Sequence, residues 1–102
     1  MGSGSLQVFA TPCMVALMEQ AACNAVDPCF DDSESSVGTL VNITHDAATA
    51  PGKKVTATAT LVEVQGRKLV FEVTAADEDK QIGKGRHERF IINKEKFMAK
   101  LG

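Results

Sequence analysis

The chain has no tryptophan and no tyrosine, and its five phenylalanines are scattered along 102 residues. Its charge is nearly balanced, because 11 basic and 13 acidic side chains are mixed along the sequence and give a net charge of −2. Nucleic-acid-binding domains present a basic face or aromatic side chains that stack on bases, and a membrane-spanning helix needs about 20 apolar residues in a row. The sequence has none of these features, so we expect neither a nucleic-acid partner nor a membrane.

Cysteine is scarce, and the three thiols do not form a metal-binding pattern. Cys13, Cys23 and Cys29 lack C-x-x-C spacing, so no zinc site is expected, and no other metal or cofactor. An odd number of thiols is typical of buried cysteines in a reducing compartment. The start of the chain also lacks the basic segment followed by an apolar one that marks secretion. These absences predict a cytoplasmic protein.

Length and composition predict one domain, residues 1–102. Hydrophobic residues make up 44% of the chain and charged residues 24%, which is ordinary for a globular protein. A chain this short has little stability to spare, and association with a second copy would bury more apolar surface. We therefore expect at least a dimer. The segment from Met1 to Ser5 is predicted to be a flexible lead-in.

A helix is predicted from Thr11 to Val26. Thr11 is a favoured N-cap residue, Pro12 suits the first helical position, and Pro28 ends the helix. The residues between them are apolar on nearly all sides instead of along one stripe. A helix of that kind is buried over most of its surface, so we expect it at the centre of the fold.

Four strand-like segments follow a polar loop at Asp31 to Ser36. The alternation is sharpest in the second, where alanines face one way and threonines the other, and in the third. The predicted strands are Val37 to His45, Val55 to Val64, Leu69 to Ala75 and Ile82 to Ile92, and a short helix, Lys94 to Leu101, closes the chain.

Turn signals and glycines separate these strands. A hairpin turn is predicted at Gln65-Gly66 and a second turn at Asp77 to Lys80. Gly83 and Gly85 indicate a bulge or a close backbone approach in the last strand. The order of elements predicts an α+β fold, in which an antiparallel meander wraps around one long buried helix.

Glu19 is the only charged residue of the predicted helix, and it lies between Leu17-Met18 and Ala21-Ala22. An unpaired buried carboxylate is expensive, and such local inconsistencies tend to mark functional sites. The alternative is that Glu19 lies on a narrow exposed strip beside Gln20 and Asn24. We favour a functional carboxylate.

His45 ends the first predicted strand and is the second candidate. Imidazole suits the work of a general base or acid near neutral pH, although a histidine at a strand end is often only a polar loop residue. The other histidine, His87, lies in the alternating sequence Arg86-His87-Glu88-Arg89. It is predicted to be a solvated or structural strand residue.

Thr11 has two candidate roles, as N-cap of the helix and as a hydroxyl at its positive end. Free amides and the helix dipole at that end would favour a developing oxyanion. On a straight helix Thr11 and Glu19 are about 12 Å apart along the axis and about 80° apart around it. Either the entry segment therefore folds back, or two chains share each site. Cys13 is a weaker alternative nucleophile, since a helix N-terminus favours the thiolate but no base accompanies it at a diagnostic spacing.

Several short motifs follow one another in a specific order. They are Phe9-Ala10-Thr11-Pro12, Leu17-Met18-Glu19, Ser36-Val37-Gly38-Thr39, Ile43-Thr44-His45-Asp46-Ala47-Ala48, Leu61-Val62-Glu63-Val64, Gly66-Arg67 and Gly85-Arg86-His87-Glu88-Arg89. In this order they resemble the fluoroacetyl-CoA thioesterase-like hot-dog family over essentially the whole chain. Each motif is weak alone, and the ordered set is specific.

The resemblance implies a hot-dog fold that acts as a homodimer, with acyl-CoA bound where the subunits meet. It implies a catalytic Thr, Glu and His, which fall on Thr11, Glu19 and His45, and it places Gly38 and Arg89 near the substrate. Members of the family usually carry a longer segment ahead of the Thr, with a first strand and part of a lid, whereas ten residues precede Thr11 here. The first strand is therefore expected to be absent, and lid-dependent selectivity for a fluorinated acyl group is not implied.

Together these residues predict hydrolysis of a short-chain acyl-CoA to a carboxylic acid and free CoA. Glu19 and His45 would move protons, and Thr11 would orient the reacting group or act as a transient nucleophile. Two rivals are a non-catalytic acyl-CoA-binding protein of the same fold and a hydratase, whose product would keep the thioester. Four basic side chains are candidates for the CoA phosphates, unless they are only solvated: Lys53, Lys54, Arg67 and Lys68.

Overall fold

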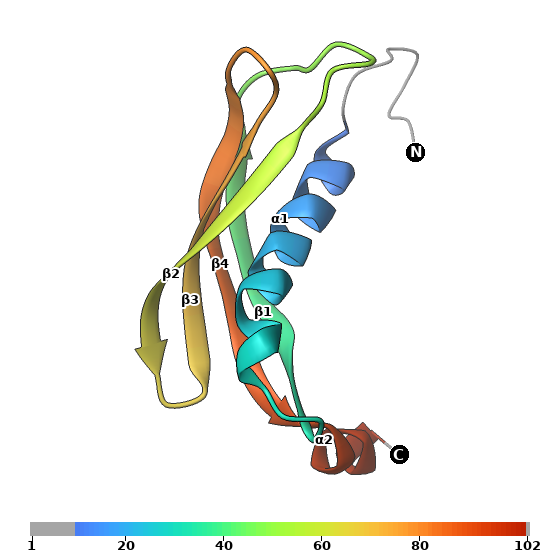
Figure 1. The fold of residues 1–102 in the computed structure, drawn as a ribbon, viewed down its shortest axis with the longest axis vertical. Coiled ribbons are helices and arrows are strands. Elements are labelled where there is room, and N and C mark those ends of the chain that lie inside the picture. Colours follow the sequence, from blue (N-terminus) through green and yellow to red (C-terminus); the bar gives the residue numbers. More distant parts are fainter. Residues whose placement is uncertain (1–9, 102) are drawn as a thin grey trace.

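The computed structural model describes residues 10–101, so the predicted lead-in and the segment on which the lid prediction falls lie outside the described residues. Within this range one long helix is followed by four strands and a short terminal helix (Figure 1). The α+β class is confirmed. The elements are α1 (Thr11–Val26), the 3₁₀ turn η1 (Asp27–Cys29), β1 (Glu34–His45), β2 (Thr56–Gln65), β3 (Lys68–Ala76), β4 (Gln81–Asn93) and α2 (Lys94–Leu101).

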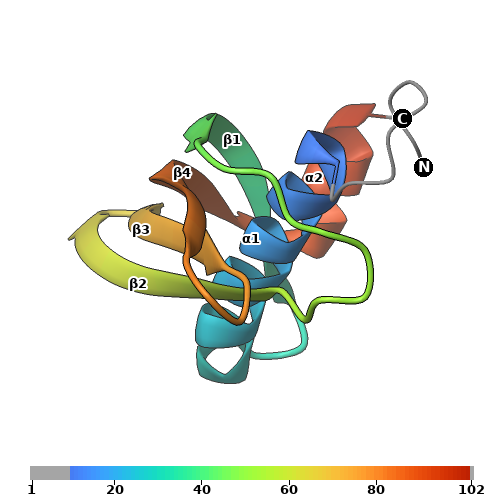
Figure 2. The same cartoon turned by 90° about the horizontal axis from the view of Figure 1, so that it is seen from above.

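The sheet is antiparallel throughout, in the order β1-β4-β3-β2. It curves around α1, which covers one of its faces (Figures 1 and 2). The strands β2, β3 and β4 form a meander, as predicted. β1 pairs with β4 and not with β2, so the prediction that all four strands form one meander is wrong. The amides of Asp46 and Ala47 hold the end of β1 there, because both donate to the carbonyl of Ile82, at 2.7 and 3.2 Å. Alternation indicates which residues share a face and does not indicate which strands are neighbours.

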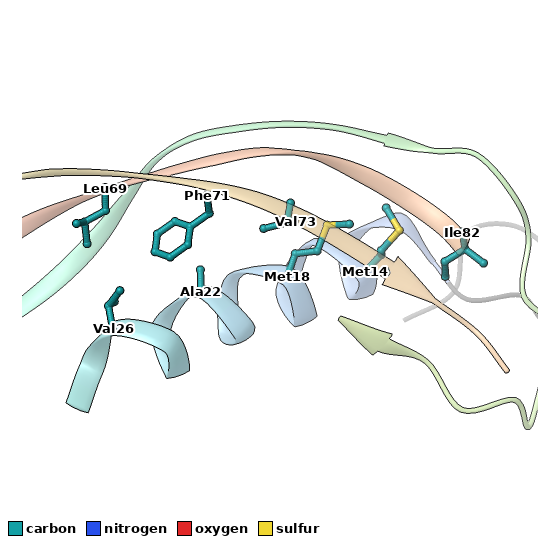
Figure 3. Close-up of a cluster of buried hydrophobic side chains, with 9 residues drawn as sticks. Met14, Met18, Ala22, Val26, Leu69, Phe71, Val73 and Ile82 are labelled. Carbon is teal, nitrogen blue, oxygen red and sulfur yellow. The ribbon is translucent and has the colours of Figure 1, made fainter. Parts of the chain in front are cut away.

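The core lies between α1 and the face of the sheet that it covers (Figure 3). The buried side chains of the helix form one stripe at four-residue spacing: Met14, Met18, Ala22 and Val26. They pack against strand residues that are also buried: Leu69, Phe71, Val73, Ala75 and Ile82. The rest of α1 is half-buried or exposed, and Leu17 is 36% exposed. Burial of α1 on most sides is therefore wrong for a single chain, because a helix on one sheet has one line of contact.

The strand predictions hold with shifted ends. In β3 the predicted apolar face, from Leu69 to Ala75, packs on α1. β1 begins at Glu34, so the second half of the predicted loop from Asp31 to Ser36 is strand. The hairpin between β2 and β3 turns at Gly66, whose φ of 61° lies in the region that favours glycine.

Two glycines of β4 allow close backbone approach, as predicted. A Cβ on Gly83 would lie 2.5 Å from Sδ of Met14, and one on Gly85 would lie 2.2 Å from the carbonyl oxygen of Asn42. Both distances are shorter than van der Waals contact. Gly83 thus lets the start of α1 pack directly on β4, near the end of β1.

The turn between β3 and β4 is built on Asp77, which is 8% exposed. Its carboxylate accepts hydrogen bonds from the amides of Asp79 (2.8 Å) and Lys80 (2.9 Å), from the hydroxyl of Thr49 (3.2 Å) and from Nζ of Lys80 (3.0 Å). Burial alone would raise the pKa of Asp77, but the hydrogen bonds and the charge of Lys80 outweigh it and hold the pKa below its ordinary value of 3.8. The ionised carboxylate therefore holds the turn that starts β4.

Asp77→Asn is expected to lower the midpoint of thermal unfolding at neutral pH, because two amides and Lys80 lose a charged acceptor. A carboxyl with a depressed folded-state pKa adds stability above its unfolded pKa and loses it as the pH falls through the folded pKa. The gap between wild type and variant should therefore close in the acid range, below about pH 4. Calorimetry across pH measures this, with the exposed Asp32→Asn as control. A gap that does not change with pH would contradict the assignment.

The thiols are less buried than predicted. Cys13 and Cys23 are half-buried and Cys29 is exposed, so the prediction of buried thiols is wrong. Cys13 and Cys23 lie next to the buried stripe of α1 and not within it. No helix in residues 10–101 is long and apolar enough to cross a bilayer.

Candidate active site

Thr11 and His45 contact each other directly. Thr11 is the first residue of α1 and His45 is the last residue of β1, and Oγ1 of Thr11 lies 2.7 Å from Nδ1 of His45. The N-cap is Ala10, in an extended conformation, and no side chain caps the helix. The prediction that Thr11 is the N-cap is therefore wrong. Because the hydroxyl is not used for capping, it is available to the imidazole.

The second ring nitrogen of His45 has a different environment. Nε2 is buried and has no hydrogen-bond partner among the described residues. Buried polar atoms without a partner are rare in folded proteins, which makes this atom a candidate contact for a further hydrogen-bonding group. His45 is held in position from its backbone, because it pairs with Gly83 of β4.

The start of α1 offers fewer free amides than predicted. Pro12 has no amide hydrogen, and the amides of Cys13 and Met14 both donate to the carbonyl of Ala10, at 3.0 and 3.1 Å. The expectation that several free amides stabilise an oxyanion is therefore wrong for these positions. The amides of Cys13 and Met14 are therefore not free for a developing oxyanion.

Glu19 lies beside β1, away from the exposed strip that was its alternative location. Gln20 and Asn24 are both exposed and bond to each other at 2.9 Å, whereas Glu19 is half-buried. Its Oε2 lies 3.3 Å from the position that a Cβ on Gly38 would take. Glu19 follows Met18 of the buried stripe, so its side chain leaves the helix at the margin of the contact with the sheet.

Gly38 is the point where three functional groups meet. Besides Glu19, the position of a Cβ on Gly38 lies 3.4 Å from Nη1 of Arg89 and 3.2 Å from Cε1 of His87. Gly38 pairs with Arg89 across β1 and β4, and the register shifts between Gly38 and Leu40, which indicates a bulge. A side chain at this position would fill the space between the three groups. The residues that the resemblance placed near the substrate thus lie together with Glu19.

Arg89 is a buried cation that is 6% exposed. Its Nε donates to Oγ of Ser36 and its Nη2 to the carbonyl of Ser36, both at 2.8 Å, and its Nη1 lies 3.2 Å from Nε2 of His87. No carboxylate of residues 10–101 forms an ion pair with it. A buried cation outside any ion pair is unfavourable, which makes Arg89 a candidate group for binding an anion or an oxygen that becomes one.

The two groups of residues are separate within one chain. Thr11 and His45 form one group, Glu19, Gly38 and Arg89 form the other, and no hydrogen bond among the described residues joins them. Gly38 and His45 lie seven positions apart on β1, a distance of about 23 Å along an extended strand. The separation agrees with the expectation from helix geometry that Thr11 and Glu19 do not meet directly.

Sequence reasoning missed two residues of this site. Ser36 is 8% exposed and holds the guanidinium of Arg89 with its hydroxyl and its carbonyl. His87 is 1% exposed, so of its two predicted roles the structural one is right and the solvated one is wrong. The one signal in the sequence was alternation, which places His87 and Arg89 on the same face of β4.

Most of the basic side chains proposed for CoA phosphates have acidic neighbours. Lys53 forms an ion pair with Asp79. Arg67 lies 3.7 Å from the carboxylate of Glu34 and donates to the carbonyl of Ile91, and Lys68 lies 3.2 Å from the carboxylate of Glu88. Surface pairing accounts for these three cations without a ligand.

Comparison with known proteins agrees with this fold and identifies the family. Residues 1–95 match the model of a family described as fluoroacetyl-CoA-specific thioesterase. A fluoroacetyl-CoA thioesterase of Streptantibioticus cattleyicolor is 50% identical over 95 residues, which are 93% of this chain and 68% of the relative.

Solved structures give the same result. A structure of the fluoroacetyl-CoA thioesterase FlK matches with a TM-score of 0.90 and 48% identity, over 96% of this chain and 73% of that one. Variants of FlK have been crystallised with fluoroacetate and CoA and with acetyl-CoA. A Thermus thermophilus member of the thioesterase superfamily matches with a TM-score of 0.90 and 32% identity, over 95% and 72% of the two chains. The chain therefore belongs to the fluoroacetyl-CoA-specific thioesterase family, and it is a thioester hydrolase of the hot-dog fold.

Proposed function

We propose that the protein hydrolyses a short-chain acyl-CoA to the carboxylic acid and free CoA, with Thr11, Glu19 and His45 as its catalytic groups. The observation that carries the proposal is the 2.7 Å contact between Oγ1 of Thr11 and Nδ1 of His45. A hydroxyl bonded to an imidazole is the arrangement that activates an oxygen nucleophile. Family membership and the CoA ligands of FlK support the substrate class.

The contact supports a reaction in two steps, acylation of Thr11 and hydrolysis of the resulting ester. Oγ1 of Thr11 attacks the thioester carbonyl carbon while its proton moves to Nδ1 of His45, and the CoA sulfur then leaves and takes that proton. Water next attacks the Thr11 ester and gives a proton to His45. The C–O bond to Thr11 breaks, the acid leaves, and the proton returns to Oγ1. Each step moves one proton out to the imidazole and back.

A homodimer that pairs the two β1 strands would complete the site. β1 is an edge strand among the described residues, and Leu40 and Val41 at its middle are 38% and 44% exposed. Gly38 and His45 lie equally far from the midpoint between Val41 and Asn42. If two copies pair antiparallel about that midpoint, Gly38 of one copy lies opposite His45 of the other.

This pairing would give the unpartnered nitrogen of His45 an acceptor. Glu19 lies beside Gly38, so Glu19 of the second copy would approach Nε2 of His45, accept its hydrogen and hold the ring with Nδ1 toward Thr11. A carboxylate that orients a histidine in this way also stabilises the imidazolium that forms. Arg89 of the second copy would bring its positive charge to the thioester carbonyl, where negative charge develops. Association of two copies would also cover apolar side chains that are exposed on α1 and β1, namely Leu17, Leu40 and Val41.

A panel of short acyl-CoAs, including acetyl-CoA, fluoroacetyl-CoA and propionyl-CoA, tests the function. We expect release of free thiol in equal amount to carboxylic acid for at least one of them. Binding of CoA without turnover would favour the acyl-CoA-binding rival, and a product that keeps its thioester would favour the hydratase. CoA thioesters are intracellular metabolites, so the cytoplasm remains the predicted compartment.

A further inference from the structure

His87 is enclosed by groups from three strands. It is 1% exposed, its Nδ1 lies 2.8 Å from the carbonyl oxygen of Leu40 on β1, and its Nε2 lies 3.2 Å from Nη1 of Arg89 on β4. The ring stacks on Phe71 of β3, with centroids 6.2 Å apart and an angle of 28° between the planes. Every edge of the imidazole that can form a hydrogen bond is therefore occupied.

These partners determine which nitrogen carries the hydrogen. The carbonyl of Leu40 can only accept, so Nδ1 must carry a hydrogen and donate it. The guanidinium of Arg89 can only donate, so Nε2 must accept with its lone pair and carry none. His87 is thus the neutral Nδ1–H tautomer, and it presents a fixed acceptor to Arg89.

The acceptor determines the direction in which Arg89 points. Three of its five N–H groups have acceptors: Nε and Nη2 at Ser36, and Nη1 at His87. Ser36 fixes one edge of the guanidinium, and His87 fixes Nη1 beside Gly38, 3.4 Å from the position of a Cβ there. Without the bond to His87, Nη1 would have no acceptor on that side, and the planar head group, still held by Ser36 at Nε and Nη2, could tilt about that edge and move Nη1 away from Gly38.

We propose that His87 is a positioning residue, which acts on the reaction through Arg89 by holding Nη1 toward the space above Gly38. The inference rests on the proposed function, in which Arg89 stabilises charge at the thioester carbonyl. The buried imidazole touches no substrate in this account, and its contribution is the direction of the guanidinium. Loss of that direction should lower kcat more than it raises KM, because the charge on the oxygen develops in the transition state.

Two amide variants separate the two hydrogen bonds of the ring. His87→Gln places an acceptor near the position of Nε2 and loses the donor to Leu40, whereas His87→Asn places a donor near Nδ1 and loses the acceptor for Arg89. Both lose the stacking on Phe71, so each serves as the stability control for the other. We expect His87→Gln to keep kcat within about threefold of wild type and His87→Asn to lose about tenfold or more, at similar melting temperatures. Arg89→Lys should lose at least as much as His87→Asn.

The outcomes separate this inference from the proposed function. A wild-type protein without thioesterase activity would overturn the function, and wild-type kcat in Arg89→Lys would overturn the role of Arg89. Equal kcat in the two His87 variants, or a higher kcat in His87→Asn than in His87→Gln, would overturn the positioning role.

A readout independent of activity is NMR of ¹⁵N-labelled histidine and arginine. It should show the Nδ1–H tautomer for His87 in the wild type, and an ordered Arg89 guanidinium in the wild type and His87→Gln that becomes averaged in His87→Asn. An Nε2–H tautomer in the wild type would overturn the inference even if neither variant folds.

Discussion

Replacement of His45 by alanine is expected to lower kcat for the best acyl-CoA by about 100-fold or more, the scale of a lost general base. The physical reason is the 2.7 Å contact between Nδ1 of His45 and Oγ1 of Thr11. The other histidine, His87, cannot take over this role, because both of its ring nitrogens already have partners. Initial rates of thiol release measure the loss. KM should change little, since His45 acts on the reacting bond and not on the CoA moiety.

The double variant Thr11→Ala/His45→Ala should be scarcely slower than His45→Ala alone. Residues that act as one unit show strongly non-additive losses, because removal of either abolishes the same step. The exposed Thr58→Ala on β2 is the matched control and should keep wild-type kcat. Losses that multiply in the double variant would show that Thr11 and His45 act independently, which would contradict the activation of Thr11 by His45. Mass spectrometry of acid-quenched turnover should also find the acyl group on the peptide that contains Thr11.

Glu19→Gln is expected to lower kcat by about 100-fold or more, although Glu19 touches neither Thr11 nor His45 of its own chain. The substitution keeps the size of the side chain and removes the negative charge that would orient and stabilise His45 in the second copy. The fold should remain, because the carboxylate makes no hydrogen bond to the described residues that the amide would break. Thiol-release kinetics and the melting temperature together test this.

The control for Glu19 is Glu63→Gln, a carboxylate exposed on β2. It should leave kcat unchanged. An unchanged kcat in Glu19→Gln would remove Glu19 from the reaction, and a large fall in melting temperature would reassign it to stability.

The sequence predicted the elements better than their arrangement. Alternation found β3 and its buried face, and Gly83 and Gly85 correctly indicated close approach, because these features depend on side chains within one segment. The pairing of β1 with β4 depends on contacts between distant segments, which alternation does not encode. The predicted burial of α1 on most sides failed for a related reason, since the apolar residues of the helix do not indicate in the sequence which of them face the sheet.

The sequence indicated a site residue where its chemistry differed from that of its neighbours. Glu19 was visible because it is a lone charge in an apolar helix, and its distance from Thr11 followed from helix geometry. Ser36 and His87 were not visible, because a serine and a histidine in an alternating strand are ordinary until the strands are paired. For Thr11 the capping preference predicted one of its two candidate roles wrongly, because Ala10 is the N-cap and the hydroxyl of Thr11 contacts His45.

We propose that each site takes Thr11 and His45 from one chain and Glu19 from another. A heterodimer with Glu19→Gln in one chain and His45→Ala in the other, purified through two different affinity tags, tests it directly. One of its sites would carry both substitutions and the other neither, so we expect about half of the wild-type turnover per dimer. Turnover as low as that of the two single variants would place all three groups in one chain and contradict the account.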